Sequence, residues 1–114
     1  MSPITTHVLD LTSGKPASGL AVVLEIGAGP ERWSEIGRGV TDVNGRITAF
    51  TPPLLALARQ LYRIRFSTGA YFAARHVGTF YPEVPVVVEI DDPSQHYHIP
   101  LLLSPFGYST YRGS

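Results

Sequence analysis

The chain has no cysteine among its 114 residues, and no run of Lys and Arg. The lack of cysteine excludes disulfide bonds, thiol nucleophiles and zinc–thiolate sites. With a formal net charge of +0 at pH 7, the sequence lacks the electrostatic footprint of a protein that binds nucleic acid. Its apolar runs are far shorter than the roughly 20 residues that a membrane-spanning helix needs. We therefore expect neither a nucleic-acid partner nor a membrane segment.

The composition that remains is that of an ordinary globular protein. Hydrophobic residues make up 44% of the chain and charged residues 16%, which argues against disorder. A chain of this length is typical of one domain, and we expect it to span residues 1–114. The opening MSPITTHVLD has neither the basic nor the apolar region of a signal peptide. A cytoplasmic location is therefore the default expectation.

Glycine and proline are frequent, at 11 and 10 residues, and they divide the chain into short segments. The segments are rich in β-branched and aromatic residues, a composition typical of strands. The predicted strands are residues 4–10, 20–27, 32–40, 46–50, 61–66, 84–90, 96–103 and 107–113. This pattern predicts a mainly β fold, a sandwich of two antiparallel sheets.

Three segments carry other local signals. The stretch TGAYFAARHVG predicts one short α-helix, with Thr68 as its N-cap and Gly78 as its end. The Asn44-Gly45 pair in TDVNGRI predicts a tight turn that joins two strands into a hairpin. The stretch TPPLLALARQ fits either a loop or a helical turn.

Two histidines lie on one face of the strand predicted over residues 96–103. Successive side chains of a strand point to opposite faces, so His96 and His98 share a side. Both faces of this strand are largely apolar, so we expect the core to cover one face and a ligand or another subunit to cover the other. By the same alternation, Tyr111 and Arg112 lie on opposite sides of the last strand.

The residues that could carry chemistry leave more than one interpretation open. His7, His96 and His98 together would supply three nitrogen ligands, as in hydrolytic zinc sites, although an isolated strand histidine is more often structural. Arg46 fits either a solvated turn residue or an anchor for an anionic or carbonyl-rich ligand. The chain contains neither a phosphate-binding glycine loop nor a nucleophile elbow. A histidine and arginine site suits proton transfer on a small polar molecule.

Several stretches resemble the 5-hydroxyisourate hydrolases, the transthyretin-like enzymes of urate breakdown. These stretches are ITTHVLDLTSGKPASGL, TDVNGRI, TGAYFAARHVGTFYPEVPVVVEI and HYHIPLLLSPFGYSTYRGS, which together reach from residue 4 to residue 114. The closing YRGS is the most specific of them. The resemblance implies a transthyretin-like sandwich with one short helix. It also implies a homotetramer, a dimer of dimers, with active sites in a channel between the dimers.

The resemblance also implies roles for individual residues. His7, Arg46, His98 and Ser114 match the family's catalytic residues, and Tyr111 matches the residue that contacts substrate. The implied activity is hydrolysis of 5-hydroxyisourate at its C6–N1 bond, which yields 2-oxo-4-hydroxy-4-carboxy-5-ureidoimidazoline. The family uses no metal and no cofactor. Which of the two histidines acts as the general base stays open.

One alternative function is compatible with the same resemblance. The alternative is a transthyretin-like carrier that binds a small aromatic ligand in the channel. The bulky side chain of Tyr111 argues against it, because it should narrow the channel. The resemblance also changes the expectation for His96, from a metal ligand to a residue at the rim of the site.

Overall fold

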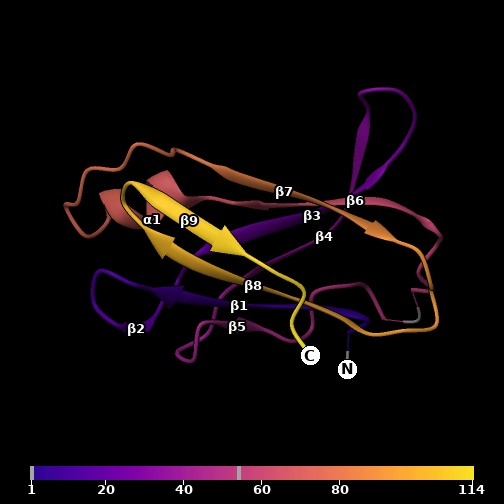
Figure 1. Ribbon diagram of the computed structural model, residues 1–114, viewed down its shortest axis with the longest axis horizontal. Coiled ribbons are helices and arrows are strands. Elements are labelled where there is room, and N and C mark those ends of the chain that lie inside the picture. Colours follow the sequence, from indigo (N-terminus) through magenta and orange to yellow (C-terminus); the bar gives the residue numbers. More distant parts are fainter. Residues whose placement is uncertain (1, 54) are drawn as a thin grey trace.

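A computed structural model describes residues 2–53 and 55–114 as two β-sheets packed face to face, with one short helix at one end (Figure 1). Along the chain lie β1 (Ile4–Asp10), β2 (Lys15–Pro16), β3 (Ala21–Gly27), β4 (Trp33–Val40), β5 (Arg46–Ile47), β6 (Gln60–Phe66), α1 (Thr68–Ala73), β7 (Val84–Ile90), β8 (Tyr97–Ser104) and β9 (Gly107–Thr110). The predicted mainly β sandwich with one short helix is confirmed.

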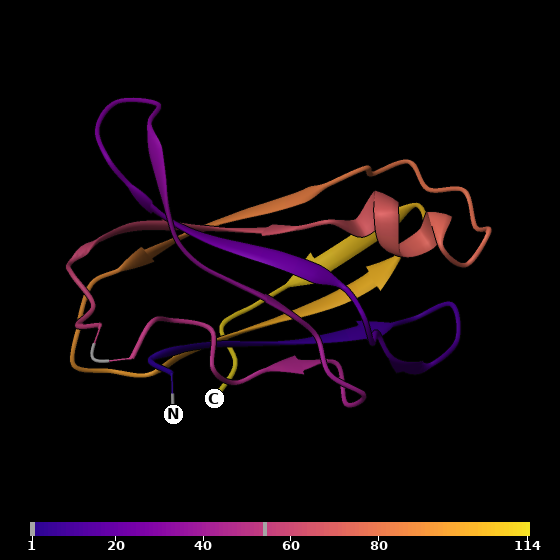
Figure 2. The same cartoon turned by 180° about the vertical axis from the view of Figure 1, so that it is seen from behind.

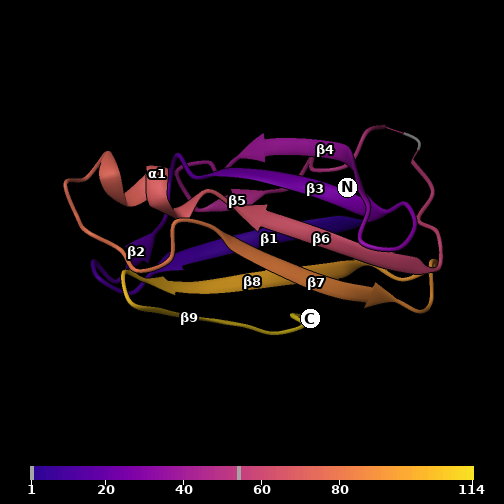
Figure 3. The ribbon, with the colours of Figure 1, turned by 90° about the horizontal axis from the view of Figure 1, so that it is seen from above.

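The first sheet has the strand order β2-β1-β8-β9, and β5 also pairs with β1. The second sheet has the order β4-β3-β6-β7. Every pair is antiparallel except β1 and β8, which run parallel with Thr5 opposite His98. Figure 3 shows that the end strands β7 and β9 lie on the same side of the two stacked sheets. The connection between β3 and β4 projects away from the sandwich (Figure 2).

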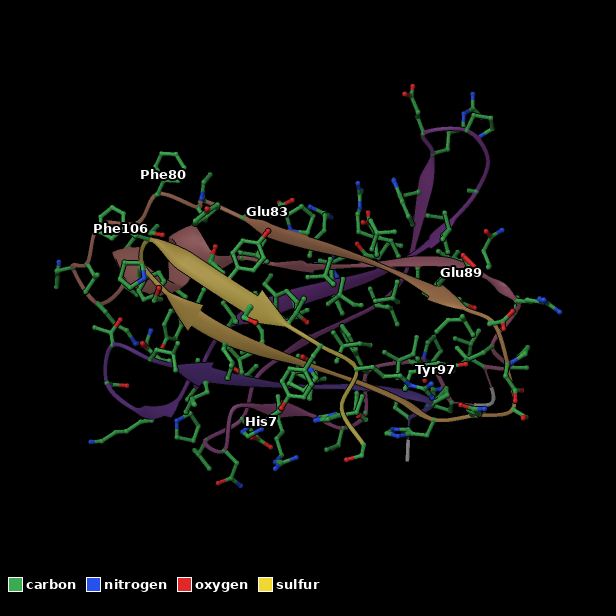
Figure 4. All side chains as sticks on the ribbon, viewed as in Figure 1. His7, Phe80, Glu83, Glu89, Tyr97 and Phe106 are labelled. Carbon is green, nitrogen blue, oxygen red and sulfur yellow. The ribbon has the colours of Figure 1, made fainter. Side chains whose placement is uncertain are left out.

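The core lies between the two sheets and is built by alternate residues of each strand. Ile4 and Val8 of β1, with Leu101 and Leu103 of β8, are 0–1% exposed. Their strand neighbours point to the other face of the first sheet, which we call the outer face. His7 is one of these neighbours, and Figure 4 shows it on the side turned away from the second sheet. The histidines therefore lie outside the core, as their alternation predicts.

The helix is shorter than predicted at its C-terminal end and lacks the predicted cap. The hydroxyl of Thr68 donates to the carbonyl of Tyr81 at 2.7 Å and so does not cap the helix. The helix ends at Ala73, well before Gly78, because His76 takes a left-handed φ of 57° that helix geometry excludes. No helix in residues 2–53 and 55–114 is long and apolar enough to cross a membrane.

The Asn44-Gly45 turn forms, but the predicted hairpin is wrong. The strand before the turn, β4, pairs with β3 in the second sheet, whereas β5 pairs with β1 in the first. The turn itself has the expected chemistry, since Gly45 has a φ of 74° and its N–H donates to the Asp42 carbonyl at 2.9 Å. The turn signal is local, and it carries no information about which strand becomes the partner. The strand after the turn is also shorter than predicted and ends at Ile47.

Two other segments differ from the expectations or resolve them. The described part of TPPLLALARQ contains no helix, so the loop interpretation holds there, and Leu54 lies outside the described residues. The last strand ends at Thr110 and not at Gly113, although Gly113 still forms a bridge to His98. Pro100 lies between the paired positions and has no N–H to donate, so the ladder is interrupted there.

Candidate active site

His7 and Arg46 lie directly opposite each other in the antiparallel register of β1 and β5. Opposed residues of a strand pair project from the same face, with β-carbons roughly 4.5–5.5 Å apart. The imidazole and the guanidinium therefore leave the outer face side by side. The backbone at Arg46 is held by the turn before it, because the backbone N–H of Arg46 donates to the Asp42 carboxylate at 3.0 Å.

His98 is half-buried on the neighbouring strand, and its ring is held from two sides. On one side, the Nδ1 atom lies 2.8 Å from the hydroxyl oxygen of Thr5. On the other, a β-carbon built on Gly113 would come within 2.7 Å of the ring carbon Cδ2. The N–H of Gly113 also donates to the His98 carbonyl at 2.8 Å. Gly113 therefore leaves the space in which the ring lies.

A hollow of about 200 Å³ opens on the outer face beside these residues. We call it the outer hollow, and its walls are Thr5, Thr6, Arg46, Thr48, His96, His98 and Ser114. It brings together three of the four residues that the resemblance marks as catalytic. The fourth, His7, is not part of the wall but adjoins it through its pairing with Arg46.

The electrostatics of the site favour neutral histidines. Burial lowers the pKa of His98 from its ordinary 6.5, and the positive charge of Arg46 lowers it further, with smaller effects of His7 and His96. Burial and then Arg46 also lower the pKa of His7, while a hydrogen bond with the Asn44 backbone and the Asp42 carboxylate partly oppose this. Both rings are therefore unprotonated at neutral pH and can accept a proton.

Tyr111 and Arg112 follow the end of β9 at Thr110, so strand alternation no longer applies to them, and neither lines the outer hollow. Arg112 faces the edge of the core, where its guanidinium lies 4.4 Å from the centre of the Tyr97 ring and donates to the Gln95 side chain at 2.6 Å. This contact gives Arg112 a structural role. Tyr111 is 56% exposed and does not line the outer hollow, so its contact with substrate stays a prediction.

Thr5 and Thr48 line the outer hollow but were not predicted from the sequence, whereas His96 was predicted at the rim of the site. Thr5 shares its face with His7 by simple alternation, so the pattern could have found it. His96 lines the outer hollow, and its Nε2 atom lies 3.2 Å from the Thr5 hydroxyl oxygen. Thr48 follows β5 in an irregular segment, where no periodicity marks its orientation.

The zinc alternative gains no support from the geometry. Among the residues that the structure describes, no three His, Cys, Asp or Glu side chains are grouped so that they could hold a metal ion. One nitrogen each of His96 and His98 is directed at the Thr5 hydroxyl and not at a shared centre. That the protein works without a metal or cofactor stays a prediction.

The fold and the site together define a two-sheet β-sandwich protein with a histidine and arginine site on the outer face of one sheet. The chain belongs to the HIUase/transthyretin family, whose family model matches residues 4–113. The resemblance stated from the sequence is thereby confirmed.

Both 5-hydroxyisourate hydrolases and transthyretins are among the similar proteins. A 5-hydroxyisourate hydrolase from Salmonella dublin is 47% identical over 111 residues, which are 97% of this chain and 80% of that protein. The solved structure of Klebsiella pneumoniae 5-hydroxyisourate hydrolase has a TM-score of 0.84 at 32% identity, covering 97% of this chain and 98% of that one. Sea bream transthyretin in complex with thyroxine has a TM-score of 0.90 at 31% identity, covering 98% and 95%. The shared fold does not separate a hydrolase from a transthyretin, whereas the residues of the site can.

Proposed function

We propose that this chain is an enzyme that hydrolyses 5-hydroxyisourate. Water opens the C6–N1 bond and yields 2-oxo-4-hydroxy-4-carboxy-5-ureidoimidazoline, as a step in urate degradation. The observation that carries the proposal is the register that sets His7 opposite Arg46, on the same outer face as His98. The name of the Salmonella dublin relative, at 47% identity, supports the same activity.

The first chemical step is removal of a proton from water. One of the two neutral histidines, His7 or His98, takes this proton while the water oxygen attacks C6. Their lowered pKa values keep both rings in the accepting form at neutral pH. A well-placed general base contributes about 10²–10⁴-fold to the rate, which suffices for a strained substrate that also decays unaided.

Arg46 stabilises the charge that develops on the substrate. As the C6 carbonyl becomes tetrahedral, its oxygen becomes negative, and the guanidinium supplies fixed donors to it. The C6–N1 bond then breaks, and N1 takes up the proton that the histidine holds. The new carboxylic acid ionises and releases one proton to solvent. Arg46 also suits the resulting carboxylate, because its planar donors match two carboxylate oxygens.

The remaining residues orient the reactants. Ser114 lies in the wall of the outer hollow, where its hydroxyl can hold water or a polar group of the substrate. Tyr111 contacts the substrate from the neighbouring segment. In this mechanism neither residue is a nucleophile, and no metal or cofactor takes part.

We propose the same assembly that the resemblance implies, a homotetramer built as a dimer of dimers with the sites in a channel between dimers. Edge strands β7 and β9 lie on one side of the sandwich, and free strand edges invite pairing with another copy. Phe80 and Phe106 near this side are 71% and 76% exposed (Figure 4). In this proposal residues 1–114 are one domain of a cytoplasmic protein. A mass four times that of the chain in light scattering supports it, and a monomer contradicts it.

The carrier function is the weaker candidate. Two ionisable imidazoles beside a guanidinium serve proton transfer, and an aromatic ligand has no need of them. Tight binding of thyroxine without faster decay of 5-hydroxyisourate would reverse this preference.

In the decisive experiment, 5-hydroxyisourate is generated in situ from urate by urate oxidase, and its decay is followed by ultraviolet absorbance. We expect the protein to accelerate the decay, and the His98→Asn variant to lose about 10²-fold or more of that acceleration. The matched control is His76→Asn, because His76 is an exposed histidine beyond the end of α1. A wild-type rate equal to the spontaneous rate overturns the proposal.

A further inference from the structure

The hydroxyl of Thr5 lies between two histidine rings of the adjacent strand. Its oxygen is 2.8 Å from Nδ1 of His98 and 3.2 Å from Nε2 of His96. Thr5 is on β1, directly opposite His98 in the parallel pairing with β8. The residue is only 5% exposed, so its hydroxyl is largely shielded from water.

The number of protons limits how this arrangement can be bonded. A hydroxyl has one proton to donate and lone pairs with which to accept. Within the described residues, the hydrogen bonds of the Thr5 hydroxyl are those to the two rings. A buried hydroxyl proton without an acceptor costs free energy. The hydroxyl therefore donates to one ring and accepts from the other, and this choice couples the tautomers of His96 and His98.

We propose that Thr5 is a positioning residue that holds His98 in the tautomer whose Nδ1 carries the proton. Nδ1 of His98 donates to the Thr5 hydroxyl, and the hydroxyl donates to Nε2 of His96. The inference rests on the proposed function, because a general base needs an unprotonated nitrogen free to meet its substrate. In this tautomer that nitrogen is Nε2 of His98.

This direction of the hydrogen bonds suits proton uptake. When Nε2 of His98 takes a proton, Nδ1 already donates to Thr5, so no hydrogen bond has to be remade. The bond becomes charge-assisted and hence stronger. The opposite direction would place a proton on Nε2 of neutral His98 and leave it unable to accept one. His96 thus belongs to the site as the acceptor that fixes the direction.

Protonation of His96 reverses the arrangement. A charged His96 must donate from Nε2, so Thr5 then donates to Nδ1 of His98 and the base form is lost. The other charged or titratable groups that act on His98 are Arg46 from β5 and His7 from β1. Neither of these touches the Thr5 hydroxyl, so the coupling between His96 and His98 is distinct from their effects.

The test compares Thr5→Val with Thr5→Ser. Valine has nearly the shape of threonine and suits a strand, but it lacks the hydroxyl, whereas serine retains it. We expect Thr5→Val to lower kcat by about tenfold or more while KM changes less, and Thr5→Ser to stay within a few-fold of wild type. Long-range proton–nitrogen NMR of the imidazoles should show His98 protonated at Nδ1 in the wild type and in Thr5→Ser, and a loss of this preference in Thr5→Val.

The outcomes separate this inference from the proposed function. If the wild type does not accelerate 5-hydroxyisourate decay but the NMR pattern holds, the function fails and the tautomer assignment stands. If Thr5→Val keeps both the wild-type kcat and the wild-type tautomer, the inference is overturned. Should Thr5→Val fail to fold, His96→Ala decides, because removing the acceptor should shift His98 towards a proton on Nε2. An unchanged tautomer in His96→Ala also overturns the inference.

Discussion

His7 and Arg46 are paired across β1 and β5, although the turn before Arg46 follows a strand of the other sheet. The chain crosses between the sheets through residues 41–45, and Asp42 holds the start of β5 in place. The backbone of Arg46 is thereby held next to the strand that carries His7, and its positive charge lowers the pKa of both His7 and His98. In the proposed mechanism this one position acts in two ways, through the substrate oxygen and through the pKa values of the histidines.

Replacing Arg46 should reveal both effects. In Arg46→Gln we expect a loss of about 10²–10³-fold in kcat from the missing oxyanion stabilisation. The pKa of His98 should also rise towards its ordinary value, because Arg46 is the second cause of its lowering, after burial. The acid limb of the remaining activity then moves to higher pH. Rate measurements across pH and an NMR titration of His98 check the two effects.

Arg46→Lys is the matched control for the charge. Lysine keeps the positive charge, so the acid limb should stay near its wild-type position. The rate should recover only in part, because an ammonium group lacks the planar pair of donors. If Arg46→Gln keeps the wild-type pH profile, the assigned influence of Arg46 on the pKa of His98 is contradicted.

Stability should fall as the pH falls through the ordinary histidine range. The pKa values of His7 and His98 are lowered from 6.5 in the folded protein, so the unfolded chain binds these protons more readily. Stability is therefore unaffected by these groups well above pH 6.5 and decreases below it. The acid limb of kcat/KM should likewise lie below pH 6.5. Urea denaturation between about pH 5 and 8 measures how steeply the free energy of unfolding changes with pH. A His7→Asn, His98→Asn double variant should show a weaker dependence on pH.

Gly113→Ala should impair the reaction far more than it impairs the fold. The new β-carbon would lie 2.7 Å from Cδ2 of His98 and 3.1 Å from a Pro100 ring carbon, so the imidazole must move. A displacement of about 1 Å at a catalytic group can cost about 10²-fold in rate. Gly78→Ala is the control, because a β-carbon there meets nothing within 4 Å. Equal activities of the two variants would contradict the role given to Gly113.

A buried hydrogen bond between α1 and β1 should contribute measurably to stability. The Tyr71 hydroxyl donates to the Asp10 carboxylate at 2.8 Å, and the two residues are 5% and 4% exposed. Tyr71→Phe leaves one carboxylate oxygen without this donor, and we expect a loss of about 1–3 kcal/mol in denaturant unfolding. Tyr108→Phe, with its residue 41% exposed, should change stability little. A Tyr71→Phe variant as stable as Tyr108→Phe would contradict this account.

Tyr71 also makes the protein sensitive to alkali. Burial, together with the Asp10 hydrogen bond, raises the pKa of Tyr71 from 10.0 to about 12. The unfolded chain therefore loses this proton first, and stability should decrease between pH 10 and about 12. Unfolding experiments over this range should show the decrease in the wild type and a smaller one in Tyr71→Phe. Parallel curves for the two proteins would contradict it.

The alternation of strand residues was enough to place the histidines outward but not to identify their neighbours. Because strand side chains alternate between two faces, the burial of one face determines the face on which His7 and His98 lie. The contact between Thr5 and His98 joins residues that are 93 positions apart, and no local pattern carries that pairing. The Asn44-Gly45 turn shows the same limit, since its residues specify a turn but not the sheet to which the next strand belongs. His76 ends the helix through its left-handed backbone conformation, which a histidine in the sequence does not predict.

The parallel pairing of β1 with β8 also bears on how the site comes into being. Contacts between residues so distant in sequence raise the contact order of the protein, and such topologies fold slowly because large loops must close first. His7 and its partner Arg46 emerge early during synthesis, but the proposed site lacks His98 until β8 has been made and has docked beside β1. If the proposed function holds, enzymatic activity would therefore report completed folding of the first sheet, including β8.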